Sequence, residues 1–282
     1  MDRVLVLRLE SLGIVAEAVF NGVPLLRTVA QLPGPAAQDP AAGPAEPQCL
    51  SISVNEYVTA GSNRLELRLQ PAAPCQAADG EPWISDGQRG ACLRLLLPRK
   101  GQRAHPETAR TLAQLDWAPV ADALVELPAL VTQTLDLPIN FPRWRWLDAP
   151  PVGTTVELAA LQAPAATFLQ GLALGLSRGD AEPLVQASRL RLEELSQAYQ
   201  HDLVDSVGRL RQQVQQLHAA LALRPAMPKA STLLLRAVAD GRLLECLAPD
   251  GQALLRSAVA GSGQVAWPLR LAFIEGRFYV LR

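Results

Sequence analysis

Four side chains that can exchange protons lie close together in the second half of the chain. They are Tyr199, His201, Asp202 and Asp205. A histidine beside carboxylates can titrate near neutral pH, so this group would suit general acid–base catalysis at the mouth of a pocket. The alternative is an exposed, ion-paired helix. Arg189 precedes Glu193 by four residues, and the same spacing separates Asp205 from Arg209. Pairs at this spacing stabilise a solvated helix face. We favour the ion-paired helix and keep the four side chains as candidate catalytic groups.

An alternation of arginine and tryptophan comes earlier in the chain. It comprises Arg143, Trp144, Arg145 and Trp146. In an extended segment the two tryptophans would share one face and the two arginines the other. Aromatic residues and arginine are enriched at interaction hot spots, so these four residues are our candidate partner-binding site. We favour another role for them, as an aromatic wedge that seals two domains while the arginines bind acidic groups. Stacking on single-stranded nucleic acid is a third possibility.

The sequence holds no recognisable cofactor, nucleotide or metal motif. A phosphate-binding glycine loop must join a strand to a helix, whereas the glycines at 261–263 lie between two expected strands and have no lysine beside them. The G-x-S-x-G elbow of serine hydrolases is absent. His105 and His218 are isolated from other metal ligands. We therefore expect no cofactor and no metal, and we favour a protein without enzymatic activity.

The four cysteines are too few and too widely spaced for a disulfide scaffold. Cys49, Cys92 and Cys246 fall inside expected strands, where buried and unreactive thiols are usual. A bridge between Cys75 and Cys92 is the alternative.

Composition and charge narrow the class of protein. The chain has 282 residues, enough for two domains, and its 49% hydrophobic and 19% charged residues exclude a disordered chain. The formal net charge of −1 argues against nucleic-acid and membrane-surface binding, although a local charged patch stays open. Charged residues interrupt the opening stretch, and no apolar run approaches the length of a membrane span. We expect a cytoplasmic protein.

The first half of the sequence alternates in the manner of strands. Asn21-Gly22 between apolar runs predicts a tight hairpin turn, because both central residues of such a turn need a positive φ. A proline-rich loop is expected over 33–47 and a second loop over 71–90. Expected strands cover 4–9, 14–20, 23–26, 50–54, 65–69 and 92–97, and we also assign the ambiguous stretch 114–137 to strands.

After a proline-rich stretch the period of the apolar residues lengthens to that of helices. We expect three helices in series, over 155–176, 181–201 and 203–223. The third has a narrow apolar stripe that would pack in the core or against a second subunit. Short strands follow over 232–239, 243–247, 253–258, 265–274 and 278–281, separated by turns at Asp240-Gly241, Asp250-Gly251 and Glu275-Gly276.

The phrases NGVPL at 21–25 and SVNEYVTAGSNRLELRL at 53–69 resemble a pattern of bacterial β-sandwich modules of the galactose-binding or jelly-roll kind. Gly61 would permit a tight turn, Asn63 would bond to the turn backbone, and Leu65 and Leu67 would enter the core. The resemblance implies a fold and no ligand.

The order of helices and strands in the second half resembles the cone-shaped fold of nuclear transport factor two and SnoaL-like proteins. The closest phrases are FLQGLALGLSRGDAEPL at 168–184 and the closing LRLAFIEGRFYVLR. In that fold a curved sheet and helices enclose a pocket, which some members use for catalysis and others for binding or dimerisation. No residue here matches a catalytic motif of the family.

The sequence therefore predicts an α+β protein. It would have an antiparallel β-sandwich over 1–138, a Pro/Trp-rich linker over 139–152, and a cone-like domain of three helices and a curved antiparallel sheet over 153–282. The expected function is protein binding, as an accessory, adaptor or immunity-type protein of a bacterial cell, with another protein or a second copy of the chain as partner. Two alternatives are a small-molecule-binding domain or enzyme with its pocket in the cone, and a carbohydrate-binding module.

Overall fold

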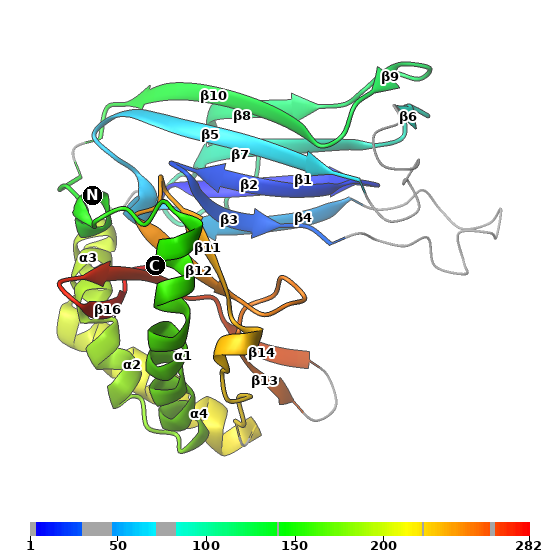
Figure 1. Ribbon diagram of the computed structural model, residues 1–282. Coiled ribbons are helices and arrows are strands. Elements are labelled where there is room, and N and C mark those ends of the chain that lie inside the picture. Colours follow the sequence, from blue (N-terminus) through cyan, green and yellow to red (C-terminus); the bar gives the residue numbers. More distant parts are fainter. Residues whose placement is uncertain (1–3, 30–46, 72–82, 140, 222, 260–262) are drawn as a thin grey trace. The chain divides into compact units, whose positions relative to one another are not determined.

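The computed structural model describes residues 4–29, 47–71, 83–139, 141–221, 223–259 and 263–282. The chain divides into two compact units, Met1–Pro142 and Arg143–Arg282. Figure 1 shows that strands build the first unit, whereas helices and strands together build the second. The mixture of helices and antiparallel sheets confirms the α+β class predicted from the sequence.

Two four-stranded antiparallel sheets form most of the first unit. One has the order β4-β1-β7-β8 and the other β10-β5-β2-β3. The strands of the first sheet are β4 (Gln48–Ser53), β1 (Val6–Leu12), β7 (Gly90–Leu97) and β8 (Arg110–Trp117). Those of the second are β10 (Ala129–Leu137), β5 (Gly61–Gln70), β2 (Val15–Phe20) and β3 (Val23–Arg27). A short 3₁₀ turn, η2 (Asn55–Tyr57), and a two-stranded ribbon of β6 (Trp83–Ile84) and β9 (Leu124–Val125) complete the unit.

Apolar and charged side chains alternate along the strands, so that the apolar ones enter the core and the charged ones lie on the opposite face of the sheet. In β1, Leu7 and Leu9 are fully buried, whereas Arg8 and Glu10 lie on the other face of the sheet. Glu10 accepts hydrogen bonds from Arg8 and from Arg94 of the neighbouring β7, at 2.6 and 2.8 Å. Burial raises the pKa of Glu10, but these two bonds outweigh that effect and leave the pKa below its usual value.

Two asparagines join the turns that the sequence singled out. Asn21 and Gly22 have positive φ values of 49° and 76°, which confirms the predicted hairpin turn between β2 and β3. The Asn21 Nδ2 donates to Asn63 Oδ1 at 2.9 Å. Asn63 Nδ2 donates to the carbonyls of Thr59 and Gly61, and Gly61 has a φ of 80°. The predicted roles of Gly61 and Asn63 are therefore confirmed.

The stretch 114–137, whose structure was ambiguous from the sequence, contains the second half of β8 and all of β10. β8 begins at Arg110, before the expected start, and pairs with β7 through a register shift between Leu95 and Leu96. β10 is an edge strand that pairs with β5 over all nine of its residues. The expected loop at 33–47 falls almost wholly, and that at 71–90 largely, outside the described residues.

Four helices begin the second unit, where the sequence predicted three. They are α1 (Thr155–Ser177), α2 (Glu182–Ala187), α3 (Arg189–Tyr199) and α4 (Leu203–Leu221). The expected second helix is divided at Ser188, whose φ and ψ of −99° and 7° leave the helical region. The Ser188 amide still bonds to Leu184, and the apolar period continues across the break, so the division leaves little trace in the sequence.

Local signals position the first helix. Thr154 and Glu157 form a capping box at the start of α1, each side chain accepting from the other residue's backbone N–H. After α1, Gly179 takes a φ of 69°, and the ring of His218 lies so close that a methyl group at residue 179 would clash with it. Asp180 then accepts a hydrogen bond from the amide of Glu182 at the start of α2.

A third four-stranded antiparallel sheet, which belongs to the second unit, follows the helices in the order β11-β12-β15-β16. Its strands are β11 (Leu234–Val238), β12 (Leu243–Leu247), β15 (Arg270–Ile274) and β16 (Arg277–Val280), and β13 (Leu255–Val259) pairs with β14 (Gly263–Trp267) in a separate ribbon. The expected strand at 265–274 is divided because Pro268 has no N–H to donate to a ladder. Positive φ at Gly241, Gly251 and Gly276 confirms the three predicted turns.

One apolar cluster lies between the helices and this sheet. It joins α1 residues such as Leu169 and Leu176 to the sheet residues Leu244 and Leu271. α4 adds one fully buried side chain, Val214, and rests its other apolar residues on the cluster more loosely. The apolar stripe of α4 therefore packs in the core of this unit.

Candidate functional site

The tryptophans of the candidate partner-binding site lie in the interior. Trp144 and Trp146 are 1% and 2% exposed, and Arg145–Asp148 forms a 3₁₀ turn, η3, in place of the expected extended segment. Residues 143–152, expected as part of a linker, belong to the second unit. Their large aromatic area is covered, so these two rings offer no surface to a partner in this conformation.

The two arginines of the same segment bind carboxylates. Arg143 pairs with Asp148 at 2.8 Å, and this hydrogen-bonded contact holds the pKa of Asp148 below its usual value. Arg145 pairs with Glu193 at 2.6 Å. The expectation that these arginines bind acidic groups is confirmed. Glu193 was expected to pair with Arg189 along its own helix, and the structure corrects its partner to Arg145.

A buried ion pair lies beside the tryptophans. Glu194 is 4% and Arg282 1% exposed, and Arg282 Nη1 donates to Glu194 Oε2 at 2.5 Å. The other carboxylate oxygen accepts from the backbone N–H of Arg145. The Arg282 guanidinium carbon lies 6.0 Å from the ring centre of Trp144 and 5.8 Å from that of Trp146, within reach of a cation–π interaction. Sequence reasoning missed Glu194 and Arg282, because nothing in the sequence distinguishes them from surface charges.

The four candidate catalytic groups stand at the junction of α3 and α4. His201, Asp202 and Asp205 are exposed and Tyr199 is half-buried. Asp202 Oδ1 accepts from the amides of Val204 and Asp205, so Asp202 is the N-cap of α4.

The histidine of this group faces a cation. His201 Nδ1 lies 3.5 Å from Arg209, and its ring centre lies 6.1 Å from that of Tyr199. Among the described residues, His201 shares no side-chain hydrogen bond with Asp202 or Asp205. Arg209 was expected to pair with Asp205, but its contacts are with His201 and Ser206. The geometry of Asp202 is that of the N-cap of α4.

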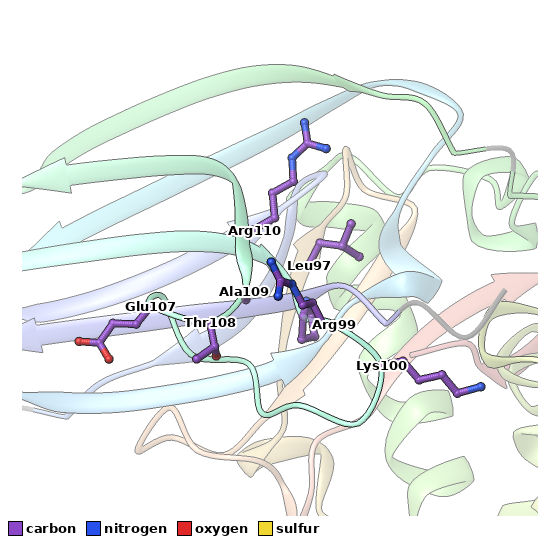
Figure 2. A pocket seen from close by; sticks show the side chains of 8 residues that line it. Leu97, Arg99, Lys100, Glu107, Thr108, Ala109 and Arg110 are labelled. Carbon is purple, nitrogen blue, oxygen red and sulfur yellow. The ribbon is translucent and has the colours of Figure 1, made fainter.

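A cationic pocket opens where β7 meets β8. Its volume is about 660 Å³, and it lies against the connection between these two strands. Its lining residues are Leu97, Pro98, Arg99, Lys100, Glu107, Thr108, Ala109 and Arg110. Figure 2 shows Arg99 lying beside Ala109, with Glu107 and Lys100 extending outward on opposite sides. We call this site the cationic pocket.

The strand register and the loop chemistry explain why the charges gather there. Leu97 and Arg110 are cross-strand partners at the end of the hairpin where the connection joins β7 to β8. The intervening connection reads PRKGQRAHPETA, with three basic residues and one glutamate. Glu107 Oε2 lies 3.7 Å from His105 Nδ1, and within the described parts of the chain neither Arg99 nor Arg110 has an ion-pair partner. Guanidinium groups without an ion-pair partner among the described residues, in a lining that also holds Leu97, Pro98 and Ala109, suit an acidic ligand with apolar side chains.

A smaller cavity of about 310 Å³ lies at the other end of the same hairpin. Glu10, Cys92 and Asp116 are among its lining residues. Burial, together with a hydrogen bond to Asp116, raises the pKa of the Cys92 thiol to about 12. Burial also raises the pKa of the fully buried Cys246. Cys49 was expected to be buried, but it is exposed, because the alternation along β4 places it opposite Glu10 on the face of the sheet away from the core.

These environments predict the order of thiol modification. At about pH 8 iodoacetamide should alkylate Cys49 in the native protein while Cys92 and Cys246 stay intact, because only the thiolate is nucleophilic. Peptide mapping by mass spectrometry reads each cysteine separately, and in urea all should react. Alkylation of native Cys92 as fast as that of Cys49 would contradict the prediction. The alternative bridge involves Cys75, which lies outside the described residues, whereas Cys92 is a free thiol.

Metal ligands do not converge in the described parts of the chain. No group of three or more His, Cys, Asp or Glu side chains there has a geometry that could hold a metal ion. His105 is exposed, and His218 is half-buried against Gly179. Among the described helices α1 alone is long and apolar enough to cross a bilayer, and a third of its most apolar stretch is buried in the protein.

The chain was compared with family models, with curated proteins and with solved structures. None of the three comparisons found a match.

Proposed function

We propose that the chain is a non-enzymatic binding protein that holds an acidic segment of a partner protein in the cationic pocket. The observation that carries the proposal is the pair Arg99 and Arg110, two exposed guanidinium groups without an ion-pair partner among the described residues, beside a cavity of about 660 Å³. Leu97, Pro98 and Ala109 add apolar surface to the same cavity. An extended segment of alternating acidic and apolar residues would match both kinds of lining.

The proposal also assigns a fold to each unit and places the binding site in the first. The first would be a β-sandwich of the jelly-roll kind, in which two sheets share one apolar layer and the connections at their ends carry the binding site. The second would be a cone-like domain, in which the four helices cover the sheet β11-β12-β15-β16. Such a protein would work as an accessory or adaptor, because its site offers charge and shape without a group poised for chemistry.

Binding of a defined peptide tests this function. We would titrate a fluorescein-labelled peptide of alternating glutamate and leucine with the full chain and follow fluorescence anisotropy. The double variant Arg99→Glu/Arg110→Glu should bind at least about tenfold more weakly, because two attractive contacts become repulsive. Added salt should weaken binding to the wild type, because the pocket is open to solvent.

A matched variant controls for net charge. Arg189→Glu/Arg277→Glu makes the same change of charge at two exposed arginines of the second unit and should bind like the wild type. A peptide with lysine in place of glutamate should not bind. Equal binding by the pocket variant and the wild type, with both folded by circular dichroism, would refute the proposed function.

A further inference from the structure

Apolar side chains are exposed at the end of the first unit that is opposite to the cationic pocket. Ile84, Val120 and Leu124 are 63%, 74% and 67% exposed. Ile84 and Leu124 are cross-strand partners in the ribbon β6–β9, so their side chains share one face. Val120 lies in the connection that leads into β9. We call these three residues the apolar tip; Figure 1 shows its ribbon at one end of the strands.

Hydrogen bonds hold the backbone of the apolar tip in one conformation. The Ser85 amide donates to Ala123 at 2.9 Å, and the Asp122 amide donates back to Ser85 at 2.9 Å. The Ser85 hydroxyl reaches the carbonyl of Pro119, and Gly87 packs so closely on Ala121 that a side chain there would crowd it. Apolar side chains fixed in water by a rigid frame are typical of an interaction surface, because little ordering entropy is lost on binding.

The charges around the apolar tip are acidic. Asp122 and Glu126 are exposed on either side of Leu124, and neither has an ion-pair partner in the part of the chain that the structure describes. Asp86 adds a third carboxylate, shared with Arg89 at 3.7 Å. The apolar tip thus presents leucine and isoleucine flanked by carboxylates, which is the ligand chemistry that the cationic pocket fits.

The two surfaces cannot meet within one chain. β7 runs from Gly90, next to the apolar tip, to Leu97 in the cationic pocket, and β8 returns from Arg110 to Trp117. Eight residues of strand span about 26 Å at about 3.3 Å per residue. The complementary surfaces at the two ends of one rigid hairpin can therefore be satisfied only by another molecule.

We infer that the cationic pocket takes the apolar tip of a second copy of this chain. The inference rests on the proposed function and names the partner of the same pocket. Because the two contacting surfaces differ, the contact is head-to-tail, and it leaves one free pocket and one free tip on every pair. Assembly would then continue as the concentration rises, until a ring closes or a filament forms.

Sedimentation velocity over a wide range of concentration tests the inference on the full chain. The wild type should form species that grow beyond the dimer, and added salt should dissociate them. The pocket variant Arg99→Glu/Arg110→Glu should stay monomeric. So should the tip variant Asp122→Asn/Glu126→Arg, in which asparagine is chosen because residue 122 has a φ of 63°.

Mixing the two variants gives the sharpest result. The reversed tip of one fits the reversed pocket of the other, and the native tip and native pocket that remain also fit each other, so the equimolar mixture should form alternating species that grow beyond the heterodimer although each variant alone stays monomeric. The control Arg189→Glu/Arg277→Glu should assemble like the wild type. If the tip variant fails to fold, Ile84→Ser/Leu124→Ser removes the apolar contact and should also be monomeric.

Each other outcome counts against the inference. A wild type that stays monomeric at every concentration overturns it, as does assembly that persists in the pocket variant or in both tip variants. If the glutamate–leucine peptide still binds the pocket of a monomeric wild type, the proposed function stands and only the identity of the partner is wrong. If neither peptide binding nor assembly depends on Arg99 and Arg110, both fail.

Discussion

The variant Glu194→Ala is expected to destabilise the second unit by about 3–5 kcal/mol, because it removes the buried carboxylate that binds the buried guanidinium of Arg282. The same change removes the acceptor of the Arg145 backbone N–H, which the Glu194 carboxylate now satisfies. Trp144 and Trp146 flank the guanidinium and cannot replace a carboxylate as its partner. Urea unfolding followed by tryptophan emission measures the loss, since three of the five tryptophans belong to this unit.

The neighbouring residue supplies the control. Glu193 also binds an arginine, but the side chains of Glu193 and Arg145 are 36% and 46% exposed. Glu193→Ala should therefore cost less than about 1 kcal/mol, as expected for an ion pair in contact with water. Equal losses from the two variants would show that the buried position of Glu194 is not what stabilises the unit.

The variant Asn63→Asp should destabilise the first unit by about 3 kcal/mol, although the two side chains have almost the same shape. Asn63 is 1% exposed and donates Nδ2 to the carbonyls of Thr59 and Gly61, at 2.9 and 2.8 Å. A carboxylate has no such donor, so it would face two carbonyl oxygens while buried. The bond from Asn21 would remain, but it does not replace the two lost donors.

Hydrogen exchange of the β5 amides measures this loss without unfolding the second unit. Protection of Leu65 and Leu67 should fall in Asn63→Asp and stay unchanged in Ser62→Asp, which adds the same charge at the exposed neighbouring residue. Unchanged protection in Asn63→Asp would mean that another contact fixes the turn. Asn63→Ala, which buries no charge but loses the same donors, should fall between the two.

Turn chemistry made much of the fold predictable. Asn21-Gly22, Asp240-Gly241 and Glu275-Gly276 each adopt the positive φ values that their sequence predicts. The conformational preference of a turn depends on the few residues that form it, so tertiary packing elsewhere in the chain changes it little. The element boundaries that were predicted wrongly are those set by packing. An example is the helix break at Ser188, across which the apolar period continues.

The candidate site was harder to predict because its residues become special only through their surroundings. Trp144 and Trp146 have the composition of a hot spot, but their exposure depends on which elements cover them. Arg99 and Arg110 are ordinary arginines in the sequence, eleven residues apart, and only the pairing of β7 with β8 brings them to one pocket. The exposed Ile84 and Leu124 likewise look like core residues until the ribbon β6–β9 is seen.

Within the second unit, α4 is less strongly packed than α1, so the two helices should differ in the free energy of local unfolding. Val214 is the single buried side chain of its 19 residues, whereas α1 buries six side chains and Gly175. Lifting α4 away would therefore expose far less apolar surface than lifting α1, and the free energy of such a local opening rises with the area exposed. α4 is thus the segment of this unit that can detach and return while the α1-and-sheet core stays folded.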